Sequence, residues 1–422
     1  MRFLYLDPGL VNDLGHHAFY CRLIVGELRS RGVETKVFAF QKLGEALQRE
    51  FEAAPHFRSI TYNVNDGDPI CGWLSGFFSF SQITREDLTR LGKVDASDVV
   101  FMTSALPIQF MAMVDWLRSM PPSKAPTLAI ELMVGTESRF ALTAHGVNLA
   151  DPRPVLFRFV STRVPRDHGY RLHLLTFDRT SSRVFSDLLG RHVHTLPFPY
   201  RAITPRLNRA GKRPIVVATL GHQRPAKGYH LMPEIAEALL RSRDDIRLLV
   251  HSGLREDVLK GRMKEVHQAM RDLAAREPRL ILESGIAGRE LWPKLLEKSD
   301  LVLCPYDPQR YVASYSAVAV EAITNGIPVV GPASTSMEAL LREFGGPGTT
   351  FDQHQVTSIV AAANRVLDDF ERYANLAHRA SLIWPEIYGP NRMVDSLFAL
   401  IGGPPTSQGA VTGSEPREIL SR

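Results

Sequence analysis

Short apolar runs alternate with longer amphipathic stretches along almost the whole chain, and this alternation constrains the fold more than any other feature. Apolar runs of strand length are typical of strands that are buried on both faces of a parallel sheet. The amphipathic stretches between them have the period of helices that cover such a sheet. The pattern therefore predicts an α/β fold built from doubly wound βα units.

Two series of these units follow each other. The first has predicted strands at residues 3–7, 35–39, 59–64, 99–103, 127–131 and 173–177, and the second at residues 215–220, 247–251, 279–283, 301–304 and 328–330. Residues 192–214, between the two series, are rich in proline and polar turn residues, which is typical of a linker.

The chain of 422 residues is thus expected to form two Rossmann-like domains. We predict an N-terminal domain over residues 1–200 and a C-terminal domain over residues 201–380. A helix at about residues 381–401 is expected to return to the first domain. Residues 402–422 are rich in Gly, Pro and Ser and are expected to be a disordered tail. The carboxyl ends of the two sheets are expected to face each other across a cleft.

Composition excludes several classes of protein. Hydrophobic residues make up 44% and charged residues 23% of the chain, as in ordinary globular proteins. The net charge of +5 is divided between the two halves, which argues against a nucleic-acid partner. The cysteines, Cys21, Cys71 and Cys304, have no metal-ligand spacing and indicate reduced thiols. Without a signal peptide or a long apolar run, the sequence predicts a cytoplasmic protein, and peripheral contact with the inner face of the membrane stays open.

The strongest local motif follows the first predicted strand of the second domain and reads Thr-Leu-Gly-His-Gln-Arg-Pro-Ala-Lys-Gly over residues 219–228. Gly221 permits a tight exit from the strand, and Arg224 and Lys227 add two cations beside it. A guanidinium binds two phosphate oxygens at once and an ammonium adds a point charge, so the pair suits a diphosphate. A solvated basic loop is the alternative that this motif alone leaves open.

A second motif spans residues 310–330. Small residues around Ser316 open a predicted helix, Glu321 lies within it, Gly326 ends it, and a buried strand comes next. Backbone N–H groups at such a helix start can hold phosphate oxygens. Glu321 needs a partner in an otherwise apolar helix, and its carboxylate could accept the two hydroxyls of a ribose. An ordinary N-cap with a peripheral glutamate is the alternative.

Together these motifs resemble those of the retaining glycosyltransferases of family 4, which have the two-domain GT-B fold and use nucleotide-sugar donors. The first family motif reads Gly-Arg-x-x-x-x-Lys-Gly. Gly221, Lys227 and Gly228 match it, whereas its arginine falls on His222 and an arginine is found two residues later, at Arg224.

The second family motif reads Glu-x-x-x-x-x-x-x-Glu-Ala-x-x-x-Gly-x-Pro-Val-Val. Glu321 matches its second glutamate, and Ala322, Gly326 and residues 328–330 match the remainder of the motif. The first glutamate of the motif falls on Ala313. This departure puts the contact to the donor sugar in question.

The resemblance implies that residues 1–200 bind the acceptor and residues 201–380 bind the nucleotide sugar. It also implies a set of site residues. Arg224 and Lys227 would be catalytic, because they would stabilise the leaving diphosphate. The donor would be bound by Gly15, His16, Gly221, Tyr315, Ser316, Ala317, Val318 and Glu321. In the family, a glycine-rich loop after the first strand touches the donor diphosphate and the acceptor, so His17 is a candidate for the sugar or acceptor site. Family members often carry a catalytic-site histidine beyond a later strand; here the corresponding strand ends in Glu131, whose carboxylate is a candidate for lining the sugar site instead. Simple N-cap chemistry could also explain the loop before residue 18.

No metal or other cofactor is expected. Asp66-Gly67-Asp68 has the form of an Asp-x-Asp metal motif, but its Asn, Gly and Pro neighbours are explained by a turn. The sequence also has no Gly-x-Ser-x-Gly elbow, Walker loop or Gly-x-Gly-x-x-Gly motif, which argues against a hydrolase, an ATPase or a dehydrogenase.

The sequence and the resemblance therefore predict a hexosyltransferase, of the kind used in polysaccharide biosynthesis. It would move a sugar, with retention, from a nucleotide-diphosphate-sugar to a glycan, lipid or small-molecule acceptor. Two alternatives remain. A sugar-nucleotide epimerase on a similar fold would need acid and base groups but no acceptor. A non-catalytic partner subunit would agree with Ala313 in place of the glutamate.

Overall fold

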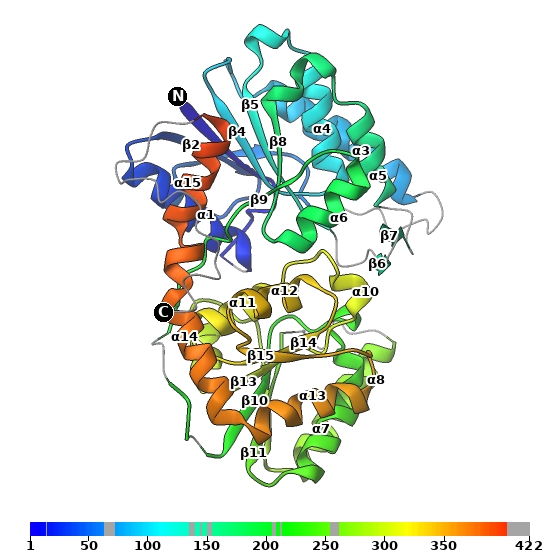
Figure 1. The fold of residues 1–422 in the computed structure, drawn as a ribbon. Helices are drawn as coiled ribbons and strands as arrows, with labels where there is room; N and C mark the ends of the chain where they lie inside the picture. The colour runs from blue at the N-terminus through cyan, green and yellow to red at the C-terminus, as the bar shows by residue number, and fades with distance from the viewer. Residues whose placement is uncertain are drawn as a thin grey trace. The chain divides into compact units, whose positions relative to one another are not determined.

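The computed structural model describes residues 1–13, 15–62, 72–134, 140–143, 146–149, 154–204, 208–211, 213–253 and 261–402. The expected tail, apart from residue 402, lies outside these ranges, as do Asp66 and Asp68. The chain divides into two compact units. Of the described residues, unit 1 comprises Met1–Pro199 and residues 390–402, and unit 2 comprises Tyr200–Gly389. Each is an α/β unit around a parallel sheet (Figure 1).

Among the described residues, the main sheet of unit 1 has seven parallel strands in the order β3-β2-β1-β4-β5-β8-β9. Strands β6 and β7 form a separate two-stranded antiparallel sheet in the same unit. The strands are β1 (Arg2–Asp7), β2 (Glu34–Phe40), β3 (Ala53–Phe57), β4 (Val99–Ala105), β5 (Thr127–Leu132), β6 (Phe140–Thr143), β7 (Gly146–Leu149), β8 (Leu172–Thr176) and β9 (His194–Thr195). The α-helices are α1 (His16–Ser30), α2 (Glu45–Phe51), α3 (Gly72–Thr89), α4 (Pro107–Arg118), α5 (Val155–Thr162), α6 (Arg179–Leu189) and α15 (Pro390–Ile401).

The sheet of unit 2 has six parallel strands within the described ranges, in the order β12-β11-β10-β13-β14-β15. They are β10 (Ile215–Thr219), β11 (Ile246–Ser252), β12 (Leu280–Ser284), β13 (Leu301–Leu303), β14 (Val329–Pro332) and β15 (Gly348–Phe351). The α-helices are α7 (Met232–Ser242), α8 (Arg262–Arg276), α9 (Leu291–Lys298), α10 (Pro308–Tyr311), α11 (Ala317–Thr324), α12 (Ser336–Glu343), α13 (Val356–Asp368) and α14 (Phe370–Tyr388). Two doubly wound units confirm the predicted fold class.

The central strands are apolar because helices cover both faces of the sheets. All seven residues of β4 are buried, and so are the last five of β1. In unit 2, the buried side chains of Ile215, Leu239 and Ile359 join β10, α7 and α13 in one core. In both sheets the strand order reverses beside the first strand, at β1/β4 and β10/β13. The carboxyl ends of the strands at such a reversal are where doubly wound folds bind ligands.

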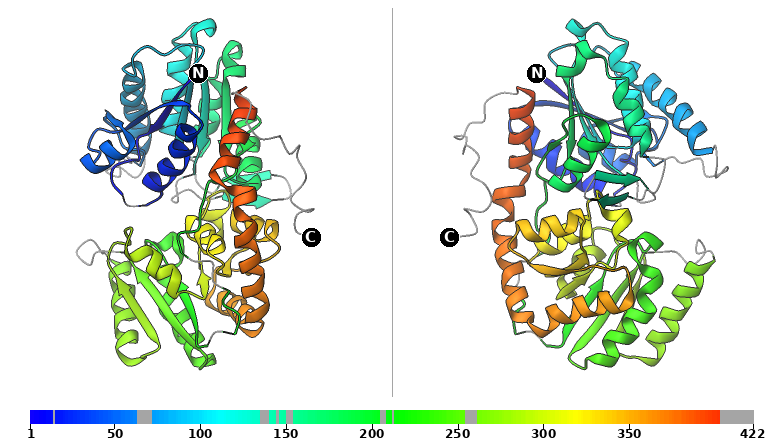
Figure 2. Two further views of the ribbon diagram at one scale, coloured as in Figure 1. Left: turned by 90° about the vertical axis from the view of Figure 1, so that its left-hand side faces the viewer. Right: turned by 45° about the vertical axis from the view of Figure 1, so that its right-hand side comes forward.

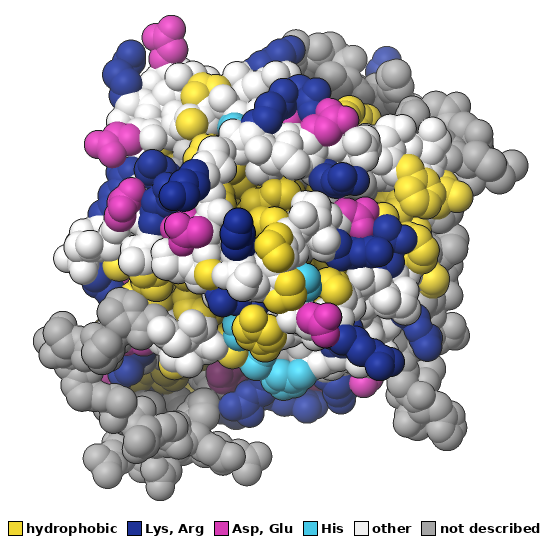
Figure 3. Space-filling model, turned by 90° about the horizontal axis from the view of Figure 1, so that it is seen from above, with side chains coloured by type: hydrophobic (Ala, Val, Ile, Leu, Met, Phe, Trp, Pro, Cys, Tyr) yellow, Lys and Arg dark blue, Asp and Glu magenta, His cyan; other side chains and the backbone are white. Residues whose placement is uncertain are grey.

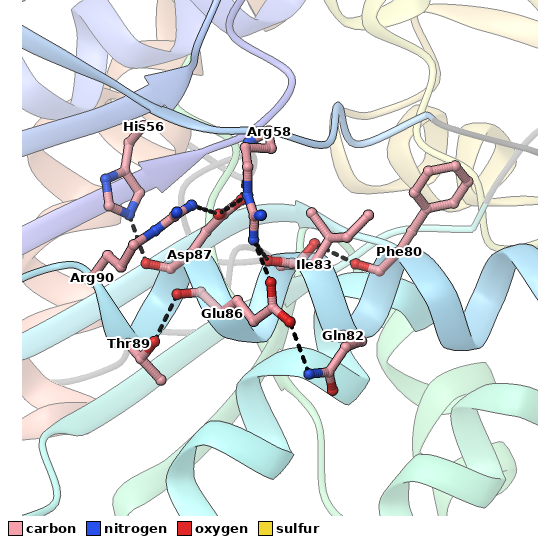
Figure 4. A network of polar contacts seen from close by, with 10 residues as sticks. His56, Arg58, Phe80, Gln82, Ile83, Glu86, Asp87, Thr89 and Arg90 are labelled. Atoms are coloured by element: carbon pink, nitrogen blue, oxygen red, sulfur yellow. Dashed lines mark hydrogen bonds and ion pairs between the residues drawn. The ribbon is translucent and has the colours of Figure 1, made fainter.

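The predicted strand at residues 59–64 is wrong for the residues that are described, because the third strand is β3, Ala53–Phe57. The chain leaves the sheet at Arg58, whose backbone N–H donates to the Asp87 carboxylate (2.9 Å) on α3 instead of to a strand. Arg58 Nε donates to the same carboxylate at 2.7 Å, and Arg90 binds it as well (Figure 4). The fully buried Asp87 thus fixes the segment after β3 to α3.

The last two helices of the described chain, α14 and α15, belong to different units. α14 belongs to unit 2, and α15 packs beside α1 in unit 1 (Figure 2). Arg31, at the end of α1, holds α15 through Asp395 Oδ1 at 2.6 Å and the Asn391 carbonyl at 3.1 Å. None of the helices in the described ranges combines the length and the apolarity needed to cross a bilayer.

Candidate functional site

The first predicted motif lies at the carboxyl end of β10, at the strand-order reversal of unit 2. Gly221 has a φ of 95°, which favours glycine. A Cβ atom there would lie 3.2 Å from Val318 Cγ2 and 3.3 Å from Lys227 Nζ. The structure therefore brings the glycine, the lysine and the start of α11 together, although they come from two motifs about 90 residues apart in the sequence.

Lys227 is half-buried, and its ammonium lies 5.4 Å from the centroid of the Tyr306 ring. Burial lowers the pKa of Lys227 to about 8. Arg224, on the same loop, is exposed. Among the described residues, no ion pair or hydrogen bond joins either side chain to an acidic group. Both cations can therefore bind an anionic ligand without first breaking an ion pair of the protein.

His222 occupies the arginine position of the family motif. Partial burial and the nearby cations Arg224 and Lys227 lower its pKa to about 4. The imidazole is consequently neutral at pH 7 and adds no positive charge. Arg224, two residues later, supplies the cation of this loop instead.

The second motif begins α11. The Ser316 hydroxyl caps the helix by accepting a hydrogen bond from the Ala319 N–H at 3.3 Å. The earlier N–H groups, of Ala317 and Val318, have no acceptor within the helix, as at any helix start. Tyr315 is half-buried just before the cap, and Ala313 is buried at 5% exposure.

Glu321 lies in the second turn of α11, and two donors hold its carboxylate. They are the indole Nε1 of Trp292, on α9, and the hydroxyl of Tyr200. Burial raises the pKa of Glu321 to about 7, and the two donors partly oppose that rise. Sequence reasoning indicated that Glu321 needs a partner but did not find Trp292 or Tyr200, because both are distant in sequence.

In unit 1, the loop after β1 differs slightly from the prediction. α1 begins at His16 rather than near residue 18, and Gly15 precedes it with a φ of 78°. His17 Nδ1 lies 2.8 and 3.0 Å from the two carboxylate oxygens of Asp7, at the end of β1. Its Nε2 lies 2.8 Å from the hydroxyl of Tyr62. Asp7 could have been noticed in the sequence as a charged residue that ends a buried strand, but nothing local pointed to Tyr62.

Glu131 is the next-to-last residue of β5 and is 2% exposed. Thr103 Oγ1 donates to its Oε2 at 2.9 Å, and Tyr20 also bonds to it. Burial raises the pKa of Glu131 to about 8. The structure thus places this carboxyl inside unit 1 with partners of its own, rather than at the surface.

The described ranges contain no group of three or more His, Cys, Asp or Glu side chains with the geometry of a metal site. Lys and Arg side chains are interspersed with Asp and Glu on the face seen from above in Figure 3.

Residues 202–382 match the family model of the glycosyl transferases group 1. Among curated proteins, no sequence match was found. Solved structures with the same fold include Alr3699/HepE from Anabaena in complex with UDP, at a TM-score of 0.59 and 15% identity over 94% of this chain and all of that one. Sucrose-phosphate synthase from Thermosynechococcus elongatus has a TM-score of 0.63 and 12% identity, over 95% of this chain and 99% of that one.

A putative UDP-N-acetylglucosamine 2-epimerase from Listeria monocytogenes is also similar, with a TM-score of 0.55 and 12% identity over 94% of this chain and 95% of that one. The two doubly wound units, together with the family match in unit 2, make this chain a glycosyltransferase with a GT-B-type fold. Its unit 2 carries the group 1 domain, and both predicted motifs lie within it.

Proposed function

We propose that the protein transfers a sugar from a nucleoside-diphosphate sugar to an acceptor hydroxyl bound by unit 1. One observation supports this proposal most directly. Gly221, Lys227 and the start of α11 lie close together at the strand-order reversal of unit 2. Such a place offers two cations and backbone N–H groups to a diphosphate. The solved structures of Alr3699/HepE with UDP and with UDP-glucose favour a uridine donor as the first to test.

The chemistry assigned to unit 2 is stabilisation of the leaving group. As the bond between the sugar and the diphosphate breaks, negative charge develops on the diphosphate oxygens. Lys227, Arg224 and the N–H groups of Ala317 and Val318 would stabilise that charge without a metal ion. Excess EDTA is expected to leave turnover unchanged, whereas loss of turnover that Mn²⁺ restores would contradict the metal-free mechanism.

Glu321 would hold the ribose. A carboxylate offers about four lone-pair positions. Trp292 and Tyr200 take two of them, so two remain for ribose hydroxyls. The donors from α9 and from Tyr200 would fix the orientation of the carboxylate.

The sugar pocket would lie around Ser314 and Tyr315. Because Ala313 replaces a glutamate of the resembled family, this pocket lacks one acceptor for sugar hydroxyls. We expect a donor sugar with fewer hydroxyls, such as a deoxy sugar. Ala313→Glu should change the preference among UDP-sugars and leave UDP affinity nearly constant in titration calorimetry.

The test of the proposed function is a product assay with UDP-sugars and a panel of glycan, lipid and small-molecule acceptors. Transfer to an acceptor with UDP release supports the proposal, and NMR of the product then tests the expected retention. Conversion of the donor sugar without an acceptor would show an epimerase. Failure to bind UDP at high concentration would leave the partner-subunit alternative.

A lipid acceptor would agree with an apolar surface on unit 1. Leu74 and Phe78 on α3 and Val155 and Phe159 on α5 are between 38% and 49% exposed, and the Phe78 and Phe159 rings lie 6.5 Å apart. Exposed Arg158 adds positive charge beside them. We propose that this surface contacts an anionic membrane. Co-sedimentation with phosphatidylglycerol vesicles, lost in Phe78→Ser/Phe159→Ser, is the expected result.

A further inference from the structure

An aromatic ring lies against the ammonium of Lys227. Lys227 is on the turn after β10, and Tyr306 comes shortly after β13, the neighbouring strand of the sheet. The ammonium lies over the Tyr306 ring, 5.4 Å from its centroid. At such a distance a cation is attracted to the partial negative charge of a ring face, and the attraction is strongest where water is excluded. Tyr306 is 1% exposed, so the ring shields this side of the ammonium from water.

The backbone fixes the two residues to each other. The N–H of Asp307, directly after Tyr306, donates at 3.0 Å to the carbonyl of Ala226, directly before Lys227. The Tyr306 N–H donates to the Cys304 carbonyl at 2.8 Å. The contact between ammonium and ring is therefore built on a hydrogen bond between the two loops that carry these side chains.

A second tyrosine fixes the orientation of the ring. Tyr311, the last residue of α10, is 3% exposed, and its ring centroid lies 4.4 Å from that of Tyr306 with 37° between the ring planes. The Tyr311 N–H donates to the Asp307 carbonyl at 3.2 Å. Packing on Tyr311 thus leaves the Tyr306 ring little freedom to turn away from Lys227.

Three nitrogen-bearing side chains act on Lys227, and none of them favours its charge. Arg224, on the same turn, repels the ammonium. Burial lowers the pKa of His222 to about 4 and also lowers the pKa of His251, on β11. Both imidazoles are therefore neutral at pH 7 and supply no counter-charge.

Two acidic groups also act on Lys227. Burial raises the pKa of Cys304 to about 12, so its thiol is neutral at pH 7. Burial raises the pKa of Glu321 to about 7, and its carboxylate already accepts from Trp292 and Tyr200. Glu321 favours the ammonium from a distance, without an ion pair between them in the described part of the chain. The Tyr306 ring is thus the group that lies directly against the buried charge.

We infer that Tyr306 is a positioning residue whose ring face holds the Lys227 ammonium charged and in place for the diphosphate, an inference that rests on the proposed donor site. The ring attracts the cation without carrying a formal negative charge. A carboxylate at this position would form an ion pair with Lys227 and repel the diphosphate. The tyrosine therefore stabilises the charged lysine and leaves it available to an anionic ligand.

The test changes the electrostatic potential of the ring and keeps its shape. Tyr306→Phe is made in the full chain, and 4-fluoro-, 3,5-difluoro- and 3,4,5-trifluorophenylalanine are then incorporated at position 306. Each fluorine withdraws electron density from the ring face and weakens its attraction for a cation. The pKa of Lys227 in the free protein, measured by NMR of ¹³C-labelled lysine, should fall stepwise by about one pH unit in total, or about tenfold in the equilibrium between charged and neutral lysine.

UDP affinity should follow the same order, but only at high pH. At pH 6 Lys227 is charged with every ring, so affinities in titration calorimetry should agree within about twofold. Above the pKa of Lys227, affinity should fall by about tenfold from the unfluorinated to the trifluorinated ring. A ring that only fills space would give the same affinity throughout the series at both pH values, which would overturn the inference.

The matched control is 3,4,5-trifluorophenylalanine at Phe351, a 1% exposed ring in the core of unit 2. It should change neither the pKa of Lys227 nor UDP affinity. A constant pKa of Lys227 through the series at position 306 would overturn the inference, and so would a falling pKa that UDP affinity does not follow. Wild type that binds no UDP would overturn the proposed donor site and the role of Tyr306 in it, whereas the NMR series would still show whether the ring holds the charge.

A further measurement needs no change at position 306. Protons above the face of an aromatic ring are shifted upfield by the ring current. In wild type, the ε-CH₂ protons of Lys227, identified by the signal that is lost in Lys227→Ala, should therefore resonate upfield of those of the exposed Lys264. Equal shifts for the two lysines would overturn the contact on which the inference depends.

Discussion

At the scale of single residues, Lys227 carries the clearest information about the ligand. Its ammonium lies over Tyr306, at the point where Gly221 and Val318 meet. Lys227→Ala should weaken UDP binding about ten- to hundredfold, the roughly 1.5–3 kcal/mol of a charged hydrogen bond, and change uridine binding little. Titration calorimetry of both ligands measures the difference.

Lys264→Ala is the matched control, because Lys264 is an exposed lysine of the same unit on α8. It should bind UDP as wild type does. Equal losses of UDP and uridine affinity in Lys227→Ala would instead show a folding defect or a diphosphate site elsewhere.

The lowered pKa of Lys227 also leads us to expect that UDP affinity depends on pH. This pKa is lowered to about 8 by burial, and the charged form binds the diphosphate. As pH rises above about 8 the free protein loses this charge, so UDP affinity should fall by up to about tenfold per pH unit. Titrations from pH 7.5 to 10 test this. Lys227→Ala should show no such slope, and a wild-type profile that is flat over this range would argue against contact between Lys227 and the diphosphate.

At the scale of elements, the short turn after β10 depends on Gly228. It has a φ of 70°, and a Cβ there would lie 1.8 Å from the carbonyl oxygen of Pro305, after β13. Gly228→Ala should therefore add left-handed strain and a backbone clash, which together cost about 2–5 kcal/mol. Thermal unfolding measures the loss.

Gly346→Ala separates the two contributions. Gly346 has a φ of 79°, but a Cβ atom at this position would meet nothing within 4 Å, so only the strain of about 1–2 kcal/mol applies. Similar losses in both variants would show that the chain relieves the clash at Pro305. The close approach of the turn to β13 would then have little influence on the site.

At the scale of the whole molecule, two units with separate sheets predict two unfolding transitions. UDP at about 100 times its Kd should stabilise the transition of unit 2 by about 2.7 kcal/mol and leave that of unit 1 in place. Differential scanning calorimetry tests this, and Gly228→Ala identifies the transition of unit 2. If UDP instead shifted the transition of unit 1, the nucleotide would have to bind to that unit.

The sequence by itself determined the doubly wound class, the position of most strands and the two motifs of unit 2. These features are local: strand-length apolar runs, helical periodicity and glycines at turns are properties of neighbouring residues. Where the local signal was ambiguous the prediction failed. Residues 59–64 have β-branched and aromatic residues, but the long-range bonds of Arg58 to Asp87 end the strand before them.

Only the tertiary structure decided which side chains meet. Trp292 reaches Glu321 across 29 positions of sequence, and Tyr62 reaches His17 across 45. The tertiary structure also buries Glu131, lowers the pKa of Lys227 and raises the pKa of Glu321. These effects depend on burial, which is set by all the groups that surround a side chain. Strand order brings such residues together. Because strand order is set by how the helices pack on the sheets, it cannot be predicted from any local stretch of sequence.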